Sequence, residues 1–383
     1  KASDAGDIGS LFFSHLSLLD ETWLPHVGQL HVPDWHSWSP ETLYVSGWMR
    51  MMPTNATYFT ISVAGNALFA GQNAHLELFA PQASVGGDLI LTNGARLTLH
   101  AVATNLPPAV SGSHGRLEVA GEVTIAANSW IHPLSEPFTG SQLQIEADRL
   151  RIDENGGIDA TAGGFHRGLS LAGYSAHGYG PGHGYASTHN GSGAGYGGRG
   201  GRSAGTTLRG YVYGDPLFPL LPGSGGAART GYPNTGGGNG GGLIWLQIQD
   251  LALINGVLKA DGGQAYGIYG GFGGGSGGAI LLQCRRVMGG TNAVLCADGG
   301  ASGANKNGGG GGGGRIAIWF GEPYTAAVAA SRLVITETAP DAFEGTVSVL
   351  EGIGYASETD YSEPGTIRFI KVLPPQGTML LLR

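Results

Sequence analysis

The chain has 383 residues, of which 72 are glycine and 19 are proline, and its formal net charge is −8. Hydrophobic residues make up 41% of it and charged residues only 13%, the reverse of a disordered, highly charged composition. The negative charge argues against nucleic acid as a partner, and the lack of an apolar run of about 20 residues argues against a membrane span. We therefore expect one elongated domain with flanking modules.

Residues 1–84 contain two alternating stretches, residues 43–49 and 58–63, that predict strands. This part of the chain is also rich in tryptophan, with Trp23, Trp35, Trp38 and Trp48. These side chains form either the core of a small β-module or a sugar-binding face. We expect the N-terminal β-module to cap the repeats that follow or to mediate assembly, because the open end of a stack of strands is an exposed edge.

Residues 85–320 are expected to form a glycine-rich repeat region. In its first part, apolar stretches begin at residues 89, 117 and 143, which are 28 and then 26 positions apart. Gly, Asn and Asp punctuate these stretches and no 3.6-residue apolar stripe is present, so the pattern predicts strands. A tandem repeat stacks each strand on its own equivalent, which predicts an all-β fold, a parallel β-solenoid or β-helix.

A long insertion at residues 165–235 interrupts the repeat region. It places His, Tyr and Arg on a glycine background, a composition suited to an adaptable contact surface, and loops of this length are uncommon unless functional or disordered. The residues that we single out as ligand-binding are His177, Tyr179, His183, Tyr185, His189 and Tyr196. The alternative is an ordered decoration whose aromatic rings pack on the glycine segments. A metal site is not expected, because no ligand spacing is tight.

Three glycine runs follow, and each leads directly into an apolar stretch. The runs are residues 236–242, 270–278 and 308–314. Asp261 and Asp298 lie 37 positions apart in segments that align without gaps, so the repeat in this part is about 37 residues long. One unit therefore consists of two strands, an Ala-Asp-Gly-Gly turn and a glycine segment.

Such glycine runs are either flexible linkers or ordered elements. Linkers do not usually recur in phase with strands, and an ordered glycine segment must offset its conformational entropy by hydrogen bonding and close packing. Glycine in the polyproline II conformation does this, because without a Cβ neighbouring helices approach closely and pair their N–H and C=O groups. Seven residues in this form span about 22 Å. We therefore expect stacked polyglycine II segments.

This style of repeat resembles the polyglycine-sandwich adhesins of phage tail fibres. It is also similar to the glycine-rich β-helix regions of large secreted bacterial surface proteins. The resemblance covers roughly residues 85–320 and includes no diagnostic catalytic motif. It implies a β-helix that acts outside the cell or at its surface.

Cys284 and Cys296 lie twelve positions apart within one repeat, both in predicted strands. They form either a disulfide that braces the repeat or two buried free thiols, and they lack the spacing of a zinc site. Asn55 and Asn190 each begin an Asn-X-Ser/Thr triplet and are potential glycosylation sites, although such triplets are common by chance.

Residues 321–383 are expected to add C-terminal strands that cap the repeats or mediate assembly. Residues 365–373 alternate, and a Pro-Pro-Gln-Gly turn separates them from a last apolar strand. The assembly residues in that strand are Met379, Leu380, Leu381 and Leu382. An apolar terminal strand pairs either within the chain or with another copy.

The leading hypothesis is a non-enzymatic extracellular structural protein, a fibre subunit or adhesin that self-associates through its terminal strands. Three features of the sequence support this hypothesis: the small number of ionisable groups, the repeated glycine segments and the predicted strands at both ends. No catalytic residue and no cofactor are expected. The alternative is a protein that binds or cleaves polysaccharides, such as surface glycans, through the insertion. A glycosidase needs two carboxylates across a cleft, whereas the acidic residues between Asp148 and Asp159 are typical of a solvated face.

Overall fold

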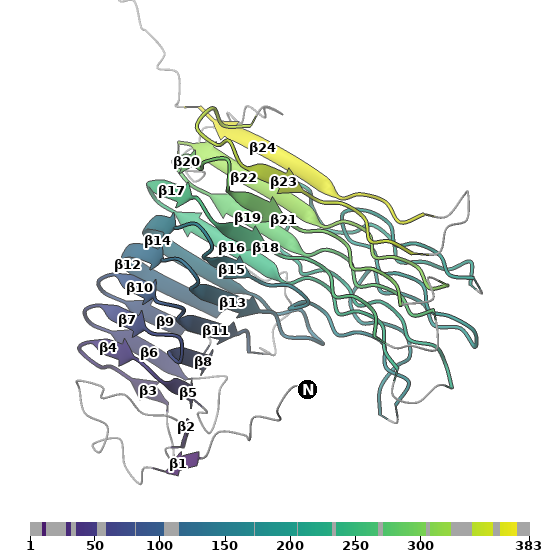
Figure 1. The fold of residues 1–383 in the computed structure, drawn as a ribbon, viewed down its shortest axis with the longest axis horizontal. Coiled ribbons are helices and arrows are strands. Elements are labelled where there is room, and N and C mark those ends of the chain that lie inside the picture. The colour runs from purple at the N-terminus through teal and green to yellow at the C-terminus, as the bar shows by residue number, and fades with distance from the viewer. Residues whose placement is uncertain are drawn as a thin grey trace, which may run out of the picture.

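The computed structural model describes residues 10–12, 28–31, 36–51, 59–80, 82–102, 115–171, 173–204, 206–231, 235–266, 271–303, 307–322, 339–354 and 361–373. Within these residues all regular secondary structure is β-strand, which confirms the predicted all-β class. The named strands form two large sheets in which neighbours pair in parallel, as predicted (Figure 1). The described residues contain no helix that could span a membrane.

The first sheet has ten strands. In order across the sheet they are β1 (Ser10–Phe12), β2 (Gly28–His31), β5 (Trp48–Met51), β8 (His75–Phe79), β11 (Arg96–His100), β13 (Trp130–Leu134), β15 (Gly157–Asp159), β18 (Val257–Lys259), β21 (Val294–Cys296) and β23 (Thr346–Ser348).

The second sheet has fourteen strands. Its main path is β24 (Thr366–Val372), β22 (Arg315–Gly321), β19 (Ala279–Gln283), β16 (Leu243–Ile248), β14 (Leu143–Ile152), β12 (Gly115–Ile125), β10 (Leu89–Thr92), β7 (Ala67–Ala70) and β4 (Leu43–Val45). One branch joins β14 to β17 (Leu251–Ile254) and β20 (Arg286–Met288), and another joins β12 to β9 (Gln82–Val85), β6 (Thr60–Val63) and β3 (Ser37–Trp38).

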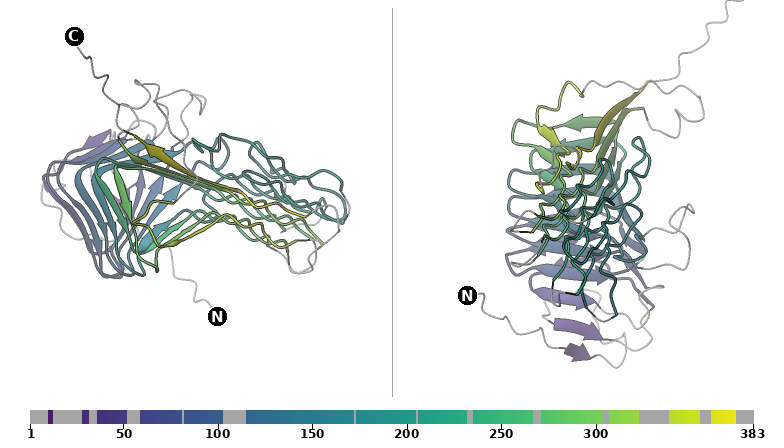
Figure 2. Two further views of the ribbon diagram at one scale, coloured as in Figure 1. Left: turned by 90° about the horizontal axis from the view of Figure 1, so that it is seen from above. Right: turned by 90° about the vertical axis from the view of Figure 1, so that its right-hand side faces the viewer.

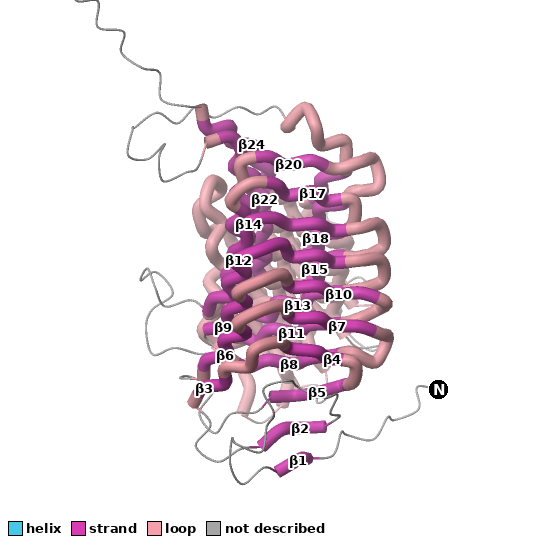
Figure 3. Tube along the Cα trace, turned by 90° about the vertical axis from the view of Figure 1, so that its left-hand side faces the viewer, coloured by secondary structure: helices cyan, strands magenta, loops and turns pink. Residues whose placement is uncertain are grey.

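The pairing pattern repeats from one turn of the chain to the next. β6, β7 and β8 pair with β9, β10 and β11, respectively, and the long strand β12 then pairs with both β9 and β10. β14 bends around the same corner one turn later and pairs with β16 and β17. The turns lie on top of one another (Figure 3), and the glycine-rich segments extend beside the strands as a second lobe (Figure 2, left).

The core consists of columns of apolar side chains that point inward at equivalent positions of successive strands. One column in the ten-stranded sheet is Met49, Leu76, Leu97, Ile131, Ile158, Leu258 and Leu295. Each member is at most 3% exposed. Along a strand such as β8, these buried residues alternate with partly exposed ones, which is the period of two that the sequence shows. Each turn therefore buries its apolar face against the turns on either side.

Asparagine makes the corner before a strand of the ten-stranded sheet in three successive turns. Asn93, Asn128 and Asn155 have φ angles of 58°, 64° and 61° and precede β11, β13 and β15, respectively. Asparagine tolerates this left-handed conformation better than other non-glycine residues, because its short polar side chain bonds locally. The punctuation seen in the sequence thus has a backbone cause.

The strands before residue 85 belong to the same two sheets as those after it. The boundary expected between residues 84 and 85 falls inside β9, and one apolar core extends from Leu30 to Val349. Trp38 is buried in this core, whereas Trp23 and Trp35 lie outside the described residues. At the other end, β23 and β24 continue the sheets by pairing with β21 and β22. The assembly residues Met379, Leu380, Leu381 and Leu382 lie outside the described residues.

Candidate functional site

The glycine runs and the glycine-rich parts of the insertion lie side by side in the second lobe of the molecule (Figure 2). We call these segments the glycine layer. It comprises residues 163–168, 178–184, 191–201, 223–228, 236–242, 271–278 and 308–314. Several segments of the insertion are therefore structural parts of the layer.

Main-chain hydrogen bonds join segments of the glycine layer that are far apart in sequence. The Gly274 N–H donates to the Gly309 carbonyl at 2.9 Å, which links the second glycine run to the third. Ala194, from the insertion, donates to the Gly274 carbonyl at 3.1 Å and accepts from the Gly312 N–H at 2.8 Å. The backbone groups of this strand-free region are satisfied in this way by one another.

Close approach of the backbones explains why these positions are glycine. A Cβ built on Gly311 would collide with the carbonyl oxygen of Gly275, and one built on Gly274 would collide with that of Gly300. Neither glycine has a positive φ, so the requirement at these positions is for space and not for an unusual backbone conformation.

Three rings of the insertion converge in a group that we call the histidine cluster: His177, His183 and Tyr185. Their ring centroids are 4.8 to 6.3 Å apart. The Ala186 N–H donates to His177 Nδ1 at 3.0 Å. Partial desolvation of this imidazole and, to a smaller extent, the neighbouring His183 lower its pKa. His177 is therefore neutral at neutral pH, and its other ring nitrogen carries the proton.

A second group of rings contains Phe138, His166, Tyr174 and Tyr179. The His166 ring stacks between Phe138 and Tyr174, at centroid distances of 5.4 and 5.6 Å, and Tyr179 meets both Phe138 and His166 edge-on. Phe138 is 48% exposed and Tyr174 47%. Phe138 follows β13, outside the insertion, and nothing in the repeat pattern places it beside the other three rings.

Two of the residues predicted to bind a ligand lie apart from these groups. Tyr196 is fully buried, with its ring 4.7 Å from that of Tyr213 and below the Arg315 guanidinium, and burial raises its pKa. It packs inside the protein and presents no surface to a ligand. His189 is exposed and shares a hydrogen bond with Thr188, and no ring contact within the described residues joins it to either group.

Cys284 and Cys296 are free, buried thiols on different sheets. Cys284 follows β19 of the fourteen-stranded sheet, and Cys296 ends β21 of the ten-stranded sheet. Of the two predicted alternatives, a disulfide or two buried free thiols, the structure has the free thiols. Burial raises the pKa of Cys284 to about 12, which suppresses its thiolate.

The structure describes one of the two potential glycosylation sites, Asn190. Asn190 is buried, its Oδ1 accepts from the Gly271 N–H at 3.1 Å, and its Nδ2 donates to the Ala204 carbonyl at 3.2 Å. A glycan on Asn190 is incompatible with these contacts. Asn55 lies outside the described residues.

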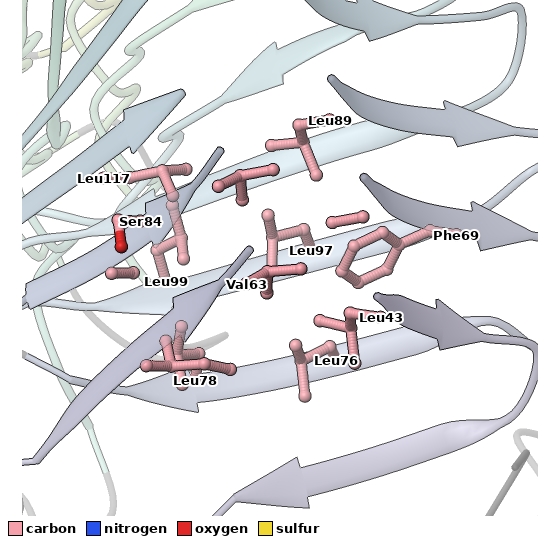
Figure 4. A pocket seen from close by; sticks show the side chains of 14 residues that line it. Leu43, Val63, Phe69, Leu76, Leu78, Ser84, Leu89, Leu97, Leu99 and Leu117 are labelled. Carbon is pink, nitrogen blue, oxygen red and sulfur yellow. The ribbon is translucent and has the colours of Figure 1, made fainter. Parts of the chain in front are cut away.

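The apolar core contains a cavity of about 30 Å³ beneath β4, β7, β8 and β11 (Figure 4). Its lining includes Leu43, Phe69, Leu76 and Leu97, which point toward one another from opposite sheets. An apolar cavity of this size is a packing defect and not a ligand site. Among the described residues, no group of three or more His, Cys, Asp or Glu side chains is arranged to hold a metal ion.

Comparison of the chain with protein-family models, with curated proteins and with solved structures found no match in any of the three. The function therefore has to be argued from the stacked strands, the glycine layer and the side chains that these place at the surface.

Proposed function

We propose that this chain is a non-enzymatic extracellular structural protein, a fibre subunit or adhesin, built as a parallel β-solenoid with a polyglycine II layer. The observation that carries the proposal is that the strand register continues into the glycine runs. The Gly242 N–H donates to the Ala160 carbonyl at 2.8 Å, and the Gly242 carbonyl accepts from the Ala279 N–H at 3.0 Å. One main-chain network thus joins both lobes, which favours a stiff rod over a flexible, linker-bearing protein.

Amide hydrogen exchange tests this architecture. The Gly274 and Gly312 amides, each bonded to another segment, should exchange as slowly as the amides of β19. Gly231 is a control, since it is exposed and has open space where a Cβ would lie. Fast exchange throughout all three glycine runs would contradict the ordered layer and with it the rod.

Turnover assays test the non-enzymatic part of the proposal. Incubation with acidic and neutral polysaccharides should produce no new reducing ends and no unsaturated products. Turnover that disappears in His183→Ala would show instead that the histidine cluster is catalytic.

We infer self-association from the two unlike ends of a solenoid. β23 and β24 end the two sheets on one side, and β1, β3 and β4 end them on the other. Contact between unlike ends is heterologous and continues into a filament unless it closes. Deleting residues 378–383 should leave the sheets folded but shorten the assemblies seen by electron microscopy. Sedimentation of the intact protein as a monomer at high concentration would contradict this inference.

A second function, polysaccharide binding through the insertion, is favoured by the convergence of the histidine cluster. Imidazole rings and a phenol offer hydrogen-bonding edges next to ring faces, a combination suited to sugars. His183→Ala and Tyr185→Phe should weaken glycan binding without changing the circular dichroism spectrum. His189→Ala is the matched control, because His189 is exposed but lies outside the cluster.

A further inference from the structure

The outward side of the ten-stranded sheet changes in character along the molecule. In β5, β8, β11 and β13, the residues that alternate with the core are mostly aromatic, imidazole or charged. In the later strands, the positions in register with Trp130 are Gly157, Val257, Val294 and Thr346. We call the distinctive outward residues of the early turns the strand-face cluster: Trp48, Arg50, His75, Glu77, Arg96 and Trp130.

Four members of the strand-face cluster form a straight row across the strands. Trp48 is in register with His75, His75 with Arg96, and Arg96 with Trp130. Neighbouring strands are about 4.8 Å apart, so the row spans about 14 Å from one tryptophan to the other. The Trp48 and His75 rings are stacked, with centroids 5.8 Å apart and planes inclined by 11°.

Because residue 157 is a glycine, the Trp130 side chain can pack directly against the sheet. The Trp130 indole covers Gly157 on the next strand, where a Cβ would lie only 2.8 Å from Trp130 Cζ3. Both ends of the row are therefore indoles that the fold holds in place, and all four members of the row are at least partly exposed.

The neighbouring outward residues fix the row and balance most of its charge. Arg50 donates two hydrogen bonds to the Glu77 carboxylate, at 2.7 and 3.2 Å, so these two charges cancel. His75 Nε2 shares a hydrogen bond of 2.9 Å with Thr98 Oγ1, and burial is the main cause of its lowered pKa. The imidazole is therefore neutral at neutral pH.

Arg96 is the unbalanced charge of the cluster. It is exposed, and within the described residues no ion pair or side-chain hydrogen bond engages its guanidinium. An exposed guanidinium between two indoles, on a chain whose net charge is −8, is a local site for an anion. Guanidinium groups match carboxylates in a planar, two-bond geometry.

We propose that the strand-face cluster binds an acidic saccharide chain, such as a polyuronate, laid across the strands from Trp48 to Trp130. The C–H faces of the sugar rings pack on the indole and imidazole planes, and a uronate carboxylate bonds to Arg96. The length of the row matches a short oligosaccharide. This site is separate from the histidine cluster, since its residues come from the strands of the ten-stranded sheet.

Calorimetric titration of the full chain with hexagalacturonate, and with maltohexaose as the neutral probe, tests the proposal. The acidic oligomer should bind and the neutral one should bind more weakly. Arg96→Gln, a change at an exposed side chain, should weaken binding of the acidic oligomer about tenfold or more, the loss expected for one charged hydrogen-bonded pair. Trp130→Ala should weaken the binding of both oligomers.

Matched controls lie away from the ten-stranded sheet. Arg285→Gln removes an exposed guanidinium between β19 and β20, and Tyr44→Ala removes an aromatic ring of β4 that is 41% exposed. Both variants should bind as the parent does. The proposal fails if the parent chain does not bind hexagalacturonate or binds both oligomers equally. It also fails if Arg285→Gln weakens binding as much as Arg96→Gln does, because the attraction would then be nonspecific.

Discussion

At the glycine layer, the absence of a single methyl group decides whether two segments can pair. The Cα of Gly311 faces the carbonyl oxygen of Gly275, while the Gly311 N–H donates to the Gly300 carbonyl at 2.9 Å. A side chain at Gly311 would thus separate two neighbouring segments at once. Glycine here costs conformational entropy on folding, which the paired backbone offsets.

Gly311→Ala should therefore destabilise the protein by roughly 2–3 kcal/mol, because the backbones must move apart to admit the Cβ. Gly290→Ala is the control, since its Cβ would meet only Asn255 Oδ1 at 3.6 Å and its φ is not positive. Urea denaturation measures both effects. Equal unfolding midpoints for the two variants would show that the segments are not packed as described.

A partly buried histidine couples the stability of the early turns to pH. His100 stacks on Phe79 at a centroid distance of 3.9 Å, near Glu77, Arg50 and His75. Burial is the main cause that lowers its pKa from 6.5 to about 4. The unfolded chain therefore takes up this proton at a higher pH than the folded chain, so this contribution to stability is complete above pH 6.5 and is lost as the pH falls toward 4.

His100→Phe keeps the ring stack but removes the titrating group. Between pH 7.5 and 4.5, the parent should lose on the order of 2 kcal/mol more unfolding free energy than the variant does. Urea titrations of both proteins at the two pH values measure this difference. Parallel losses in parent and variant would contradict the assignment to His100.

At the scale of elements, the late strands of the fourteen-stranded sheet are buried on both faces. β10 alternates between buried and partly exposed residues, whereas four consecutive residues of β19 and five of β22 are buried. Their outer face is covered by Leu217, Phe218 and Leu220 from the later part of the insertion. The Trp319 Nε1–H donates to the Leu217 carbonyl at 2.8 Å. Strands with two covered faces carry continuous apolar sequences, as β19 does and as β22 does after its first residue, Arg315.

Arg315 of β22 holds this covering segment in place. Its Nε and Nη2 donate to the Tyr213 carbonyl at 3.1 and 2.8 Å, and its Nη1 donates to Thr366 Oγ1 at 2.9 Å. Burial lowers the pKa of Arg315, which has carbonyl oxygens and a tyrosine ring as its surroundings.

Arg315→Met should lower the free energy of unfolding by about 2 kcal/mol, because it leaves buried hydrogen-bond acceptors unpaired. It should also make residues 211–222 accessible to proteolysis. Arg285→Met is the control, since Arg285 is exposed and lies 3.9 Å from Glu322, a surface pair that contributes little. Limited proteolysis and urea denaturation measure the two effects. Protection of residues 211–222 in Arg315→Met would show that the apolar contacts alone hold the segment.

At the scale of the whole molecule, the continuous core predicts that the sheets unfold together. Core side chains of β7, such as Phe69, belong to the same cluster as those of β16, such as Leu246. Native-state hydrogen exchange should give β7 and β16 similar opening free energies as denaturant is added. If the strands before residue 85 unfolded separately, at a lower denaturant concentration, the result would support the independent N-terminal β-module that the sequence predicted.

Only part of the candidate sites could be predicted from the sequence. The composition of the insertion pointed to His177, His183 and Tyr185, which the structure brings together. It also pointed to Tyr196, which is buried, because composition does not tell which rings of a folded loop face inward. Of the strand-face cluster, the sequence pointed only to Trp48, as one of several tryptophans, since the members come from four strands and align only when the turns are stacked in register.

The sequence by itself determined the strands, their parallel pairing and the recurrence of glycine before them, because alternation and repeat length are local properties of the chain. Only the tertiary structure decided that the insertion enters the glycine layer, where Ala194 bonds to Gly274 and Gly312. It also decided that the first turns share one core with the rest. Contacts of this kind depend on which distant segments meet, and glycine segments, which have no side chains, carry no pattern that specifies their partners.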